Sequence, residues 1–166
     1  VALFAGGQGE GADEQGADQV EVNPMGVFPV VDEPVTLDVF TFTAPFDVET
    51  NAFTQWLEDT TNIRVAWELV PGDSLVEKRN LLLSSGDLPD VFLSAEISPS
   101  LEQVYGSQGV LVPLNDLIDE YGEETQAMFE QFPTVERQVT MPDGNIYALP
   151  KINECFHCEY YRGRFW

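Results

Sequence analysis

The chain has 166 residues, enough for one domain with its own core, and 29 acidic against 7 basic residues give a formal net charge of -22. This charge argues against nucleic acid as a partner, because phosphate binding needs the opposite sign, and it would be repelled by anionic lipid headgroups. Two cysteines are too few for a disulfide framework, and no apolar run reaches the roughly 20 residues that span a bilayer.

The amino-terminal stretch predicts an export signal followed by a tether. Residues 1–7 are apolar and are followed by small residues, as at the end of an export signal, whose beginning we expect upstream of Val1. An ordinary flexible terminus is the alternative. From Gly6 to Pro34 the chain is rich in Gly, Ala, Gln and acids and has no basic residue, which predicts an extended, flexible tether. We therefore divide the chain into residues 1–34, signal end and tether, and residues 35–166, the folded part.

Order is predicted to begin with a strand from Val35 to Phe42, which starts as an alternation and then becomes wholly apolar or Thr. Residues 44–47 break this strand. A helix follows, which begins near Glu49 or Thr50 and is closed by Asn62. Its predicted buried face carries apolar residues at positions i, i+3 and i+4, namely Phe53, Trp56 and Leu57.

A second strand is predicted at residues 63–69, where apolar and polar residues alternate. Ser74 and Glu77 form a predicted capping box for the next helix, which ends at Gly86 because glycine accepts the left-handed conformation. The apolar residues expected to pack this helix are Leu75, Val76, Leu81, Leu82 and Leu83. The short apolar run from Val91 to Leu93 then predicts a strand that is covered on both faces.

This alternation of strands and helices predicts two successive right-handed βαβ units and a parallel sheet with the first strand in the middle. In such a sheet a switch point opens between the carboxyl ends of the first and third strands, where ligands are usually bound. The loops at residues 44–48 and 94–98 would meet there.

Beyond this unit the predicted elements are shorter. Helices are expected at residues 100–107 and 123–132, and another begins at Asn115 or Asp116. The predicted buried stripe of that middle helix is Leu117, Ile118 and Tyr121. Residues 141–145 predict a hairpin turn before a strand at residues 146–149.

The motif Cys155-Phe156-His157-Cys158 allows three readings: a redox site, a zinc site or a small structural disulfide. A structural zinc needs four ligands, and only Glu154 or Glu159 could complete a set with these two cysteines and the single histidine, so we expect no metal. An exported protein favours the disulfide between Cys155 and Cys158.

Four segments together resemble one protein family. They are ELVPGDSLVEKRNLLLSSGDLPDVFLS, GVLVPLNDLID, DGNIYALPKI and CFHCEYYRGRFW, which begin at residues 68, 109, 143 and 155. The stretch from Val35 to Trp166 is similar to the amino-terminal part of extracellular solute-binding proteins of ABC importers, in the carbohydrate-binding family. The resemblance implies an α/β fold, here the front of the first lobe of a two-lobe periplasmic-binding-protein-like fold, with a mainly parallel sheet and flanking helices.

The same resemblance implies a function. It is the capture of a sugar or oligosaccharide in the periplasm or at the outer face of the cytoplasmic membrane, with delivery to ABC permease subunits. Membrane contact would occur only through the permease, and neither a cofactor nor catalysis is implied. Because sugar binders of this kind close two lobes around the ligand, we expect the 166-residue piece alone to bind sugar far more weakly than a complete subunit.

A carbohydrate cleft needs an aromatic or proline face for the sugar ring and short polar or acidic side chains for its hydroxyls. The predicted ligand contacts at the switch point are Pro45, Phe46, Asp47, Ser94 and Glu96, with Tyr160 and Arg162 as further candidates near the end of the chain. Simpler roles are open: Asp47 would cap the following helix, Phe46 would pack under it, and Tyr160 would belong to a core.

Enzymes remain the alternative class. The chain has no Gly-x-Ser-x-Gly, P-loop or His-Glu-x-x-His motif, and a single histidine leaves no second base for a triad. A fragment of a secreted carbohydrate-active enzyme, which would use paired carboxylates, and a thiol oxidoreductase using Cys155 and Cys158 are the two enzymatic readings.

Overall fold

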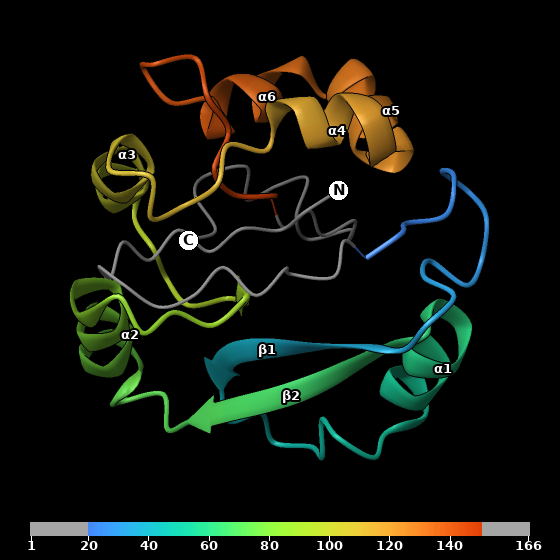
Figure 1. Cartoon of the computed structure of the whole chain (residues 1–166). Helices are drawn as coiled ribbons and strands as arrows, with labels where there is room; N and C mark the ends of the chain where they lie inside the picture. The colour runs from blue at the N-terminus through green and yellow to red at the C-terminus, as the bar shows by residue number, and fades with distance from the viewer. Residues whose placement is uncertain (1–19, 151–166) are drawn as a thin grey trace, which may run out of the picture.

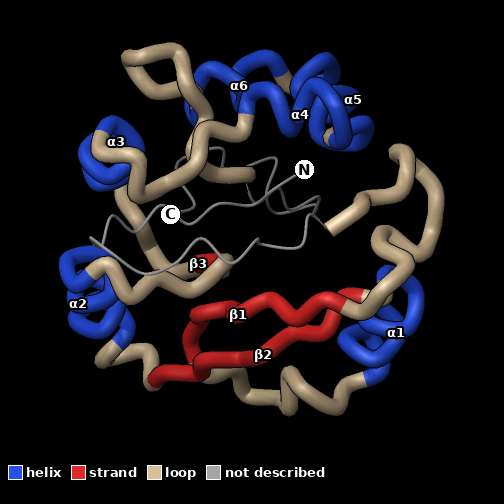
Figure 2. Tube along the Cα trace, viewed as in Figure 1, coloured by secondary structure: helices blue, strands red, loops and turns tan. Residues whose placement is uncertain are grey.

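The computed structural model describes residues 20–150 of the chain. The strands are β1 (Val35–Phe42), β2 (Ile63–Val70) and β3 (Val91–Phe92), and the helices are α1 (Ala52–Thr61), α2 (Leu75–Ser85), α3 (Pro99–Ser107), α4 (Asn115–Tyr121), α5 (Glu123–Gln131) and α6 (Pro133–Val139). Figure 1 shows β1 and β2 at one side of the molecule and α4, α5 and α6 at the other, while α2 and α3 lie between these two groups. Figure 2 shows that much of the chain between helices is loop.

The sheet has the predicted topology. Its strand order is β2-β1-β3, and both pairs are parallel, which confirms that the first strand lies in the middle. Only Val91 and Phe92 of β3 pair with β1. The carboxylate of Asp90 extends this short pairing, because Asp90 Oδ2 accepts a hydrogen bond of 2.8 Å from the backbone N–H of Asp38 in β1.

A first core cluster lies between the sheet and α2. It consists of Phe40, Val70, Leu75, Leu82 and Ala95, with Phe92 and Ile97 packed against it. Phe40 is 0 % exposed, and its ring meets that of Phe92 edge-on at a centroid distance of 5.6 Å. Val39 and Thr41 point to the opposite face of β1 and are buried as well. The central strand is therefore buried on both faces.

Helix α2 ends at Gly86 as predicted, but its start lacks the predicted capping box. Gly86 has a φ of 78°, and its backbone N–H donates to the carbonyl of Leu82 at 3.1 Å. At the other end, Ser74 has helical backbone angles and its side chain makes no capping hydrogen bond. The predicted capping box with Glu77 is wrong, because a cap side chain reaches the first turn from an extended backbone, and the Ser74 hydroxyl is hydrogen-bonded to Asp73 Oδ1 at 3.4 Å.

Four residues predicted to be buried near this helix are exposed in the described part of the chain: Val76, Leu81, Val91 and Leu93. The buried face of α2 consists of Leu75, Arg79, Leu82 and Leu83, at positions i, i+4, i+7 and i+8. The prediction that β3 is covered on both faces is thus wrong within residues 20–150. As a two-residue edge strand, β3 presents only Phe92 to the first core cluster.

The buried face of α1 also differs from the prediction. The helix begins at Ala52 rather than near residue 49 or 50, and Asn51 is its N-cap. Phe53 is 67 % exposed and Trp56 is 58 % exposed, whereas Thr54 and Thr61 are buried. Each buried hydroxyl donates to a nearby carbonyl, that of Val48 or of Leu57, at 2.7 Å. The two buried threonine hydroxyls are therefore satisfied within their own segment, and the aromatic residues Phe53 and Trp56 lie on the exposed side of the helix.

Residues 20–34 belong to the predicted tether, yet they make specific contacts with α1. Val22 and Val31 form an antiparallel bridge, and the side chain of Val31 is buried. Asn62, which closes α1 in the left-handed conformation as predicted, donates from Nδ2 to the carbonyls of Val31 at 3.2 Å and Asp32 at 2.8 Å. An ordered segment therefore begins upstream of β1, which differs from the expectation of a flexible tether up to Pro34.

A second core cluster joins the three helices α4, α5 and α6. Its members are Ile118, Phe129 and Ile146, with Leu114, Met128, Val135 and Val139 packed against them. Ile118 is the buried centre of the predicted stripe on α4, while helix α6 has no counterpart in the predictions. None of the helices within residues 20–150 combines the length and the apolar character that a membrane crossing requires.

The hairpin turn before Ile146 is present, but the predicted strand at residues 146–149 is wrong. Gly144 takes the left-handed conformation, with a φ of 87°. Within residues 20–150 a single antiparallel bridge forms across the turn, between Thr140 and Ile146. The backbone N–H of Ile146 donates to Asn115 Oδ1 at 3.0 Å instead of to a second strand. A side chain from α4 thus takes the place of further ladder pairing.

Candidate functional site

The carboxyl ends of β1 and β3 lie side by side. Phe40 pairs with Phe92, and the backbone N–H of Leu93 donates to the Phe40 carbonyl at 2.9 Å. The loops at residues 44–48 and 94–98 leave from these adjacent ends, as expected at a switch point. Farther along they separate: in Figure 1 the chain after β1 turns below β2 toward α1, whereas the chain after β3 turns toward α3. The structure brings the origins of the two loops together.

The loop at residues 94–98 has an unusual backbone. Ser94 has a φ of 51° and Glu96 a φ of 56°, in the left-handed region that side chains other than glycine rarely adopt. Both side chains are exposed, and neither forms a hydrogen bond to any group within residues 20–150. Ala95, between them, is buried in the first core cluster. Residues with a strained backbone are often found at ligand sites. Here the two strained residues place polar side chains at the carboxyl edge of the sheet.

Arg79 of α2 lies under this loop, and sequence reasoning did not identify it. Its guanidinium Nη1 donates to the carbonyl of Ala95 at 2.9 Å and to the carbonyl of Glu96. A signal was present in the sequence, because position 79 is four residues from Leu75 and four from Leu83, on the buried face of the helix. A lone arginine on an apolar helix face must find buried acceptors.

The loop at residues 44–48 contains an exposed aromatic ring, Phe46, and a carboxylate, Asp47, that is already hydrogen-bonded to neighbouring residues. Pro45 is exposed, and Phe46 is 65 % exposed. Asp47 Oδ1 accepts hydrogen bonds from the backbone N–H groups of Glu49 at 2.9 Å and Thr50 at 3.1 Å, and Asp47 Oδ2 accepts from the Thr50 hydroxyl at 2.5 Å. Asp47 therefore stabilises the turn before α1 and does not cap the helix itself, whose N-cap is Asn51, and Phe46 does not pack under the helix.

These hydrogen bonds give Asp47 a testable pH dependence. The Thr50 hydroxyl, followed by the backbone N–H groups of Thr50 and Glu49, holds the pKa of Asp47 below its ordinary value of 3.8. A carboxylate with a lowered pKa in the folded state stabilises the folded protein. This stabilisation is complete at pH values above the ordinary pKa, and it is lost as the pH falls through the folded-state pKa. Asp47→Ala should lower the melting temperature at pH 7, and the difference from the unmodified protein should shrink below about pH 4.

Melting curves recorded from pH 7 to pH 3 measure this effect. Glu49→Ala is the matched control, because the Glu49 carboxylate makes no hydrogen bond within residues 20–150. A melting-temperature difference for Asp47→Ala that stays constant across this pH range would contradict the role of the Asp47 carboxylate in stabilising the turn before α1.

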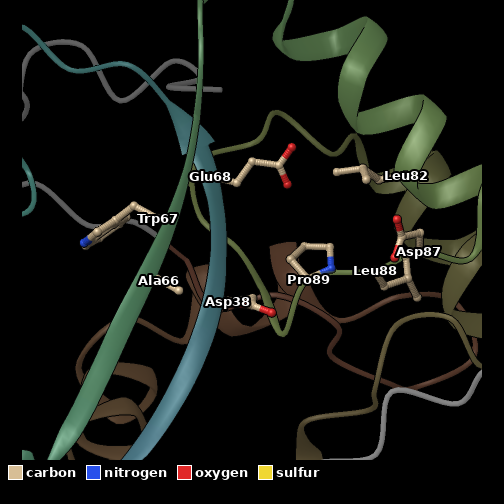
Figure 3. A pocket seen from close by; sticks show the side chains of 8 residues that line it. All are labelled: Asp38, Ala66, Trp67, Glu68, Leu82, Asp87, Leu88 and Pro89. Carbon is tan, nitrogen blue, oxygen red and sulfur yellow. The ribbon is translucent and has the colours of Figure 1, made fainter.

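A pocket of about 240 Å³ lies elsewhere, between the sheet and the segment that links α2 to β3 (Figure 3). It is lined by Asp38, Ala66, Trp67, Glu68, Leu82, Asp87, Leu88 and Pro89. Glu68 points into it and is paired with Lys78 at 3.5 Å, while Trp67 points away to the other side of β2. None of the predicted ligand contacts within residues 20–150 lines this pocket, and that part of the chain has no cluster of three metal-ligating side chains. It is separate from the candidate site.

The remaining predicted residues lie outside the described part of the chain. These are the two further ligand contacts, Tyr160 and Arg162, and the predicted disulfide partners, Cys155 and Cys158. Their roles stay predictions.

The chain is similar in sequence and in structure to known proteins. The family of bacterial extracellular solute-binding proteins matches residues 41–161. The fructooligosaccharide ABC transporter substrate-binding protein FusA of Streptococcus pneumoniae is 34 % identical over 132 residues, which are 78 % of this chain and 24 % of that protein. The structure of S. pneumoniae FusA in complex with kestose matches with a TM-score of 0.65 and 34 % identity, over 72 % of this chain and 25 % of that one.

The alginate-binding protein AlgQ2, solved without calcium ion, matches with a TM-score of 0.62 and 32 % identity. That match covers 75 % of this chain and 26 % of the AlgQ2 chain. The chain therefore spans about a quarter of the length of the relatives that it matches.

Proposed function

Since the chain belongs to the family of bacterial extracellular solute-binding proteins, we propose that it takes part in capturing a sugar or oligosaccharide outside the cytoplasmic membrane. The captured sugar would be delivered to the permease subunits of an ABC importer. The names of the relatives support the ligand class, because FusA is a fructooligosaccharide-binding protein and AlgQ2 an alginate-binding protein. FusA is named as a substrate-binding protein and AlgQ2 as an alginate-binding protein, so we propose binding and not catalysis.

The observation that links the proposed function to particular residues is the strained backbone of the loop after β3. Ser94 and Glu96 hold exposed polar groups that no neighbour within residues 20–150 occupies, and sugar hydroxyls need such acceptors and donors. The exposed ring of Phe46, after β1, would stack on a sugar ring, with Pro45 beside it. Asp47 would contribute less directly, because its carboxylate already caps the turn before α1.

Calorimetric titration of the complete gene product tests the function. We expect binding to short oligosaccharides such as kestose or alginate fragments, and no binding to an amino acid or a dipeptide used as control ligands. Micromolar or tighter affinity is the expected range for a protein that must collect dilute solute, about -8 kcal/mol or more favourable. A protein that binds none of the sugars, or that prefers the peptide, would contradict the proposal.

Substitutions at Ser94 and Glu96 test whether the sugar binds at the loop after β3. Glu96→Gln keeps the shape of the side chain and removes its charge, and Ser94→Ala removes the hydroxyl. We expect either change to weaken binding by about 1–3 kcal/mol, because a sugar hydroxyl loses its partner in a desolvated cleft. Phe53→Ala is a suitable control, because Phe53 is also exposed but lies on α1, away from the loop after β3. Equal effects of all three variants would argue against the site.

A further inference from the structure

We propose that Arg79 is a positioning residue for ligand binding: it holds the loop at residues 94–98 in the shape that presents Ser94 and Glu96 to the ligand. The inference rests on the proposed function and adds to it a residue that does not itself touch the ligand. Arg79 is 4 % exposed and lies on α2, with no carboxylate paired to it within residues 20–150. A buried guanidinium without a counter-ion needs a compensating set of acceptors.

Backbone carbonyls of the loop supply most of these acceptors. Arg79 Nη1 donates to the carbonyl of Ala95 at 2.9 Å and also to the carbonyl of Glu96. The other donors are turned toward its neighbour: Nε and Nη2 both donate to Asn80 Oδ1, at 3.1 Å and 2.9 Å. Asn80 thus orients the planar guanidinium, and the edge of that plane meets two consecutive carbonyls of the loop.

The loop needs such support because its backbone is strained. Ser94 and Glu96 both have positive φ angles, and each is unfavourable for a residue with a Cβ atom. Ala95 ties the middle of the loop to the first core cluster through its methyl group. Arg79 ties the same residue through its carbonyl, so α2 fixes the loop by packing and by hydrogen bonding together. Without the guanidinium, the two carbonyls lose their charged donor and the strained angles lose their compensation.

Arginine is suited to this task in a way that lysine is not. Its five donors lie in one rigid plane, which allows simultaneous hydrogen bonds to the loop on one side and to Asn80 on the other. A lysine at position 79 carries its three donors on one nitrogen, so it has no second nitrogen that could hold Asn80 while the ammonium group donates to the loop carbonyls. We therefore expect Arg79→Lys to retain part of the function and Arg79→Met, which keeps the length and loses every donor, to retain the least.

The test uses the complete gene product and two readouts. Calorimetric titration with kestose or an alginate oligosaccharide measures affinity, and hydrogen exchange of the amides of residues 94–98 measures how often the loop opens. Arg79→Met should lower the affinity about tenfold or more, because the ligand then selects a loop shape that is only a minor population. Arg79→Lys should show a smaller loss, and both variants should exchange faster in the loop than the unmodified protein does.

Two further variants separate positioning from stability. Ile118→Ala in the second core cluster lowers stability far from the loop, and it should leave the affinity within about twofold at temperatures well below melting. Asn80→Ala changes an exposed residue, so it folds even if Arg79→Met does not, and it should loosen the loop by releasing the guanidinium.

The proposal is overturned if the unmodified protein binds sugar and folded Arg79→Met or Asn80→Ala binds it equally well with unchanged loop exchange. Equal affinity losses in Arg79→Met and Ile118→Ala would also overturn it, since that result assigns Arg79 to stability alone. If the unmodified protein binds no sugar, the proposed function fails, and the exchange measurement still decides whether Arg79 holds the loop.

Discussion

Replacing Phe40 with alanine is expected to lower the free energy of unfolding by about 3–5 kcal/mol, the range for removing a fully buried aromatic ring. Phe40 is 0 % exposed in the central strand, and its ring meets Phe92 edge-on at 5.6 Å. The cavity would open between β1 and α2, where Leu75 and Leu82 are fixed on a helix and collapse only partly into the space. Urea unfolding followed by circular dichroism measures the change.

Phe53→Ala is the matched control for this experiment. Phe53 is also a phenylalanine of the βαβ unit, yet it is 67 % exposed on α1. Its truncation should change the free energy of unfolding by no more than about 0.5 kcal/mol, as is usual for surface substitutions. A comparable loss in both variants would mean that the aromatic stripe of α1 is buried, as the sequence pattern predicted, and that the observed orientation of the helix is wrong.

Gly106→Ala is expected to destabilise the protein by about 1–3 kcal/mol, the range for overpacking a core. A Cβ atom on Gly106 in α3 would lie 2.3 Å from Cζ of the Tyr147 ring. The ring cannot swing aside freely, because the Tyr147 hydroxyl donates to Asp143 Oδ2 at 2.8 Å and accepts from Asn145 Nδ2 at 3.1 Å. Alanine favours a helix over glycine by up to about 1 kcal/mol, which is smaller than the expected clash.

Gly72→Ala is the control for this second prediction, because a Cβ atom there would meet nothing within 4 Å. It should be neutral or slightly stabilising, since alanine restricts the unfolded chain. A double-mutant cycle adds a specific test: Tyr147→Ala should cost less in the Gly106→Ala background than in the unmodified protein. Additive effects would show that the ring and the new methyl group do not collide.

The sheet could be predicted from the sequence because its signals are local. Alternation from Val35 onward, the left-handed positions Asn62 and Gly86, and short connections all follow from backbone sterics, and each is present in the structure. The exposed faces could not be predicted in the same way. Helical spacing places Phe53 and Trp56 on one face of α1, but which face meets the sheet depends on neighbours distant in sequence.

The sequence predicted which loops form the candidate site, but it did not predict what each side chain in those loops does. Strand order alone places the loops after β1 and β3 at neighbouring strand ends. Asp47 accepts hydrogen bonds from the turn before α1, whereas the side chains of Ser94 and Glu96 make no hydrogen bond within residues 20–150. These roles depend on local backbone angles, which the sequence pattern does not reveal. Arg79 was missed because an arginine in a helix is usually assigned to the surface, although its spacing from Leu75 marked the buried face.

The first core cluster has a kinetic consequence. All of its residues lie between Phe40 and Ile97, and each connection within this range is short, so closing it costs little chain entropy. On a ribosome the amino-terminal part of a protein emerges first, and this cluster can assemble before the later helices have been synthesised. The loop at residues 94–98 enters the same cluster through Ala95, so we expect its strained shape to form together with that cluster.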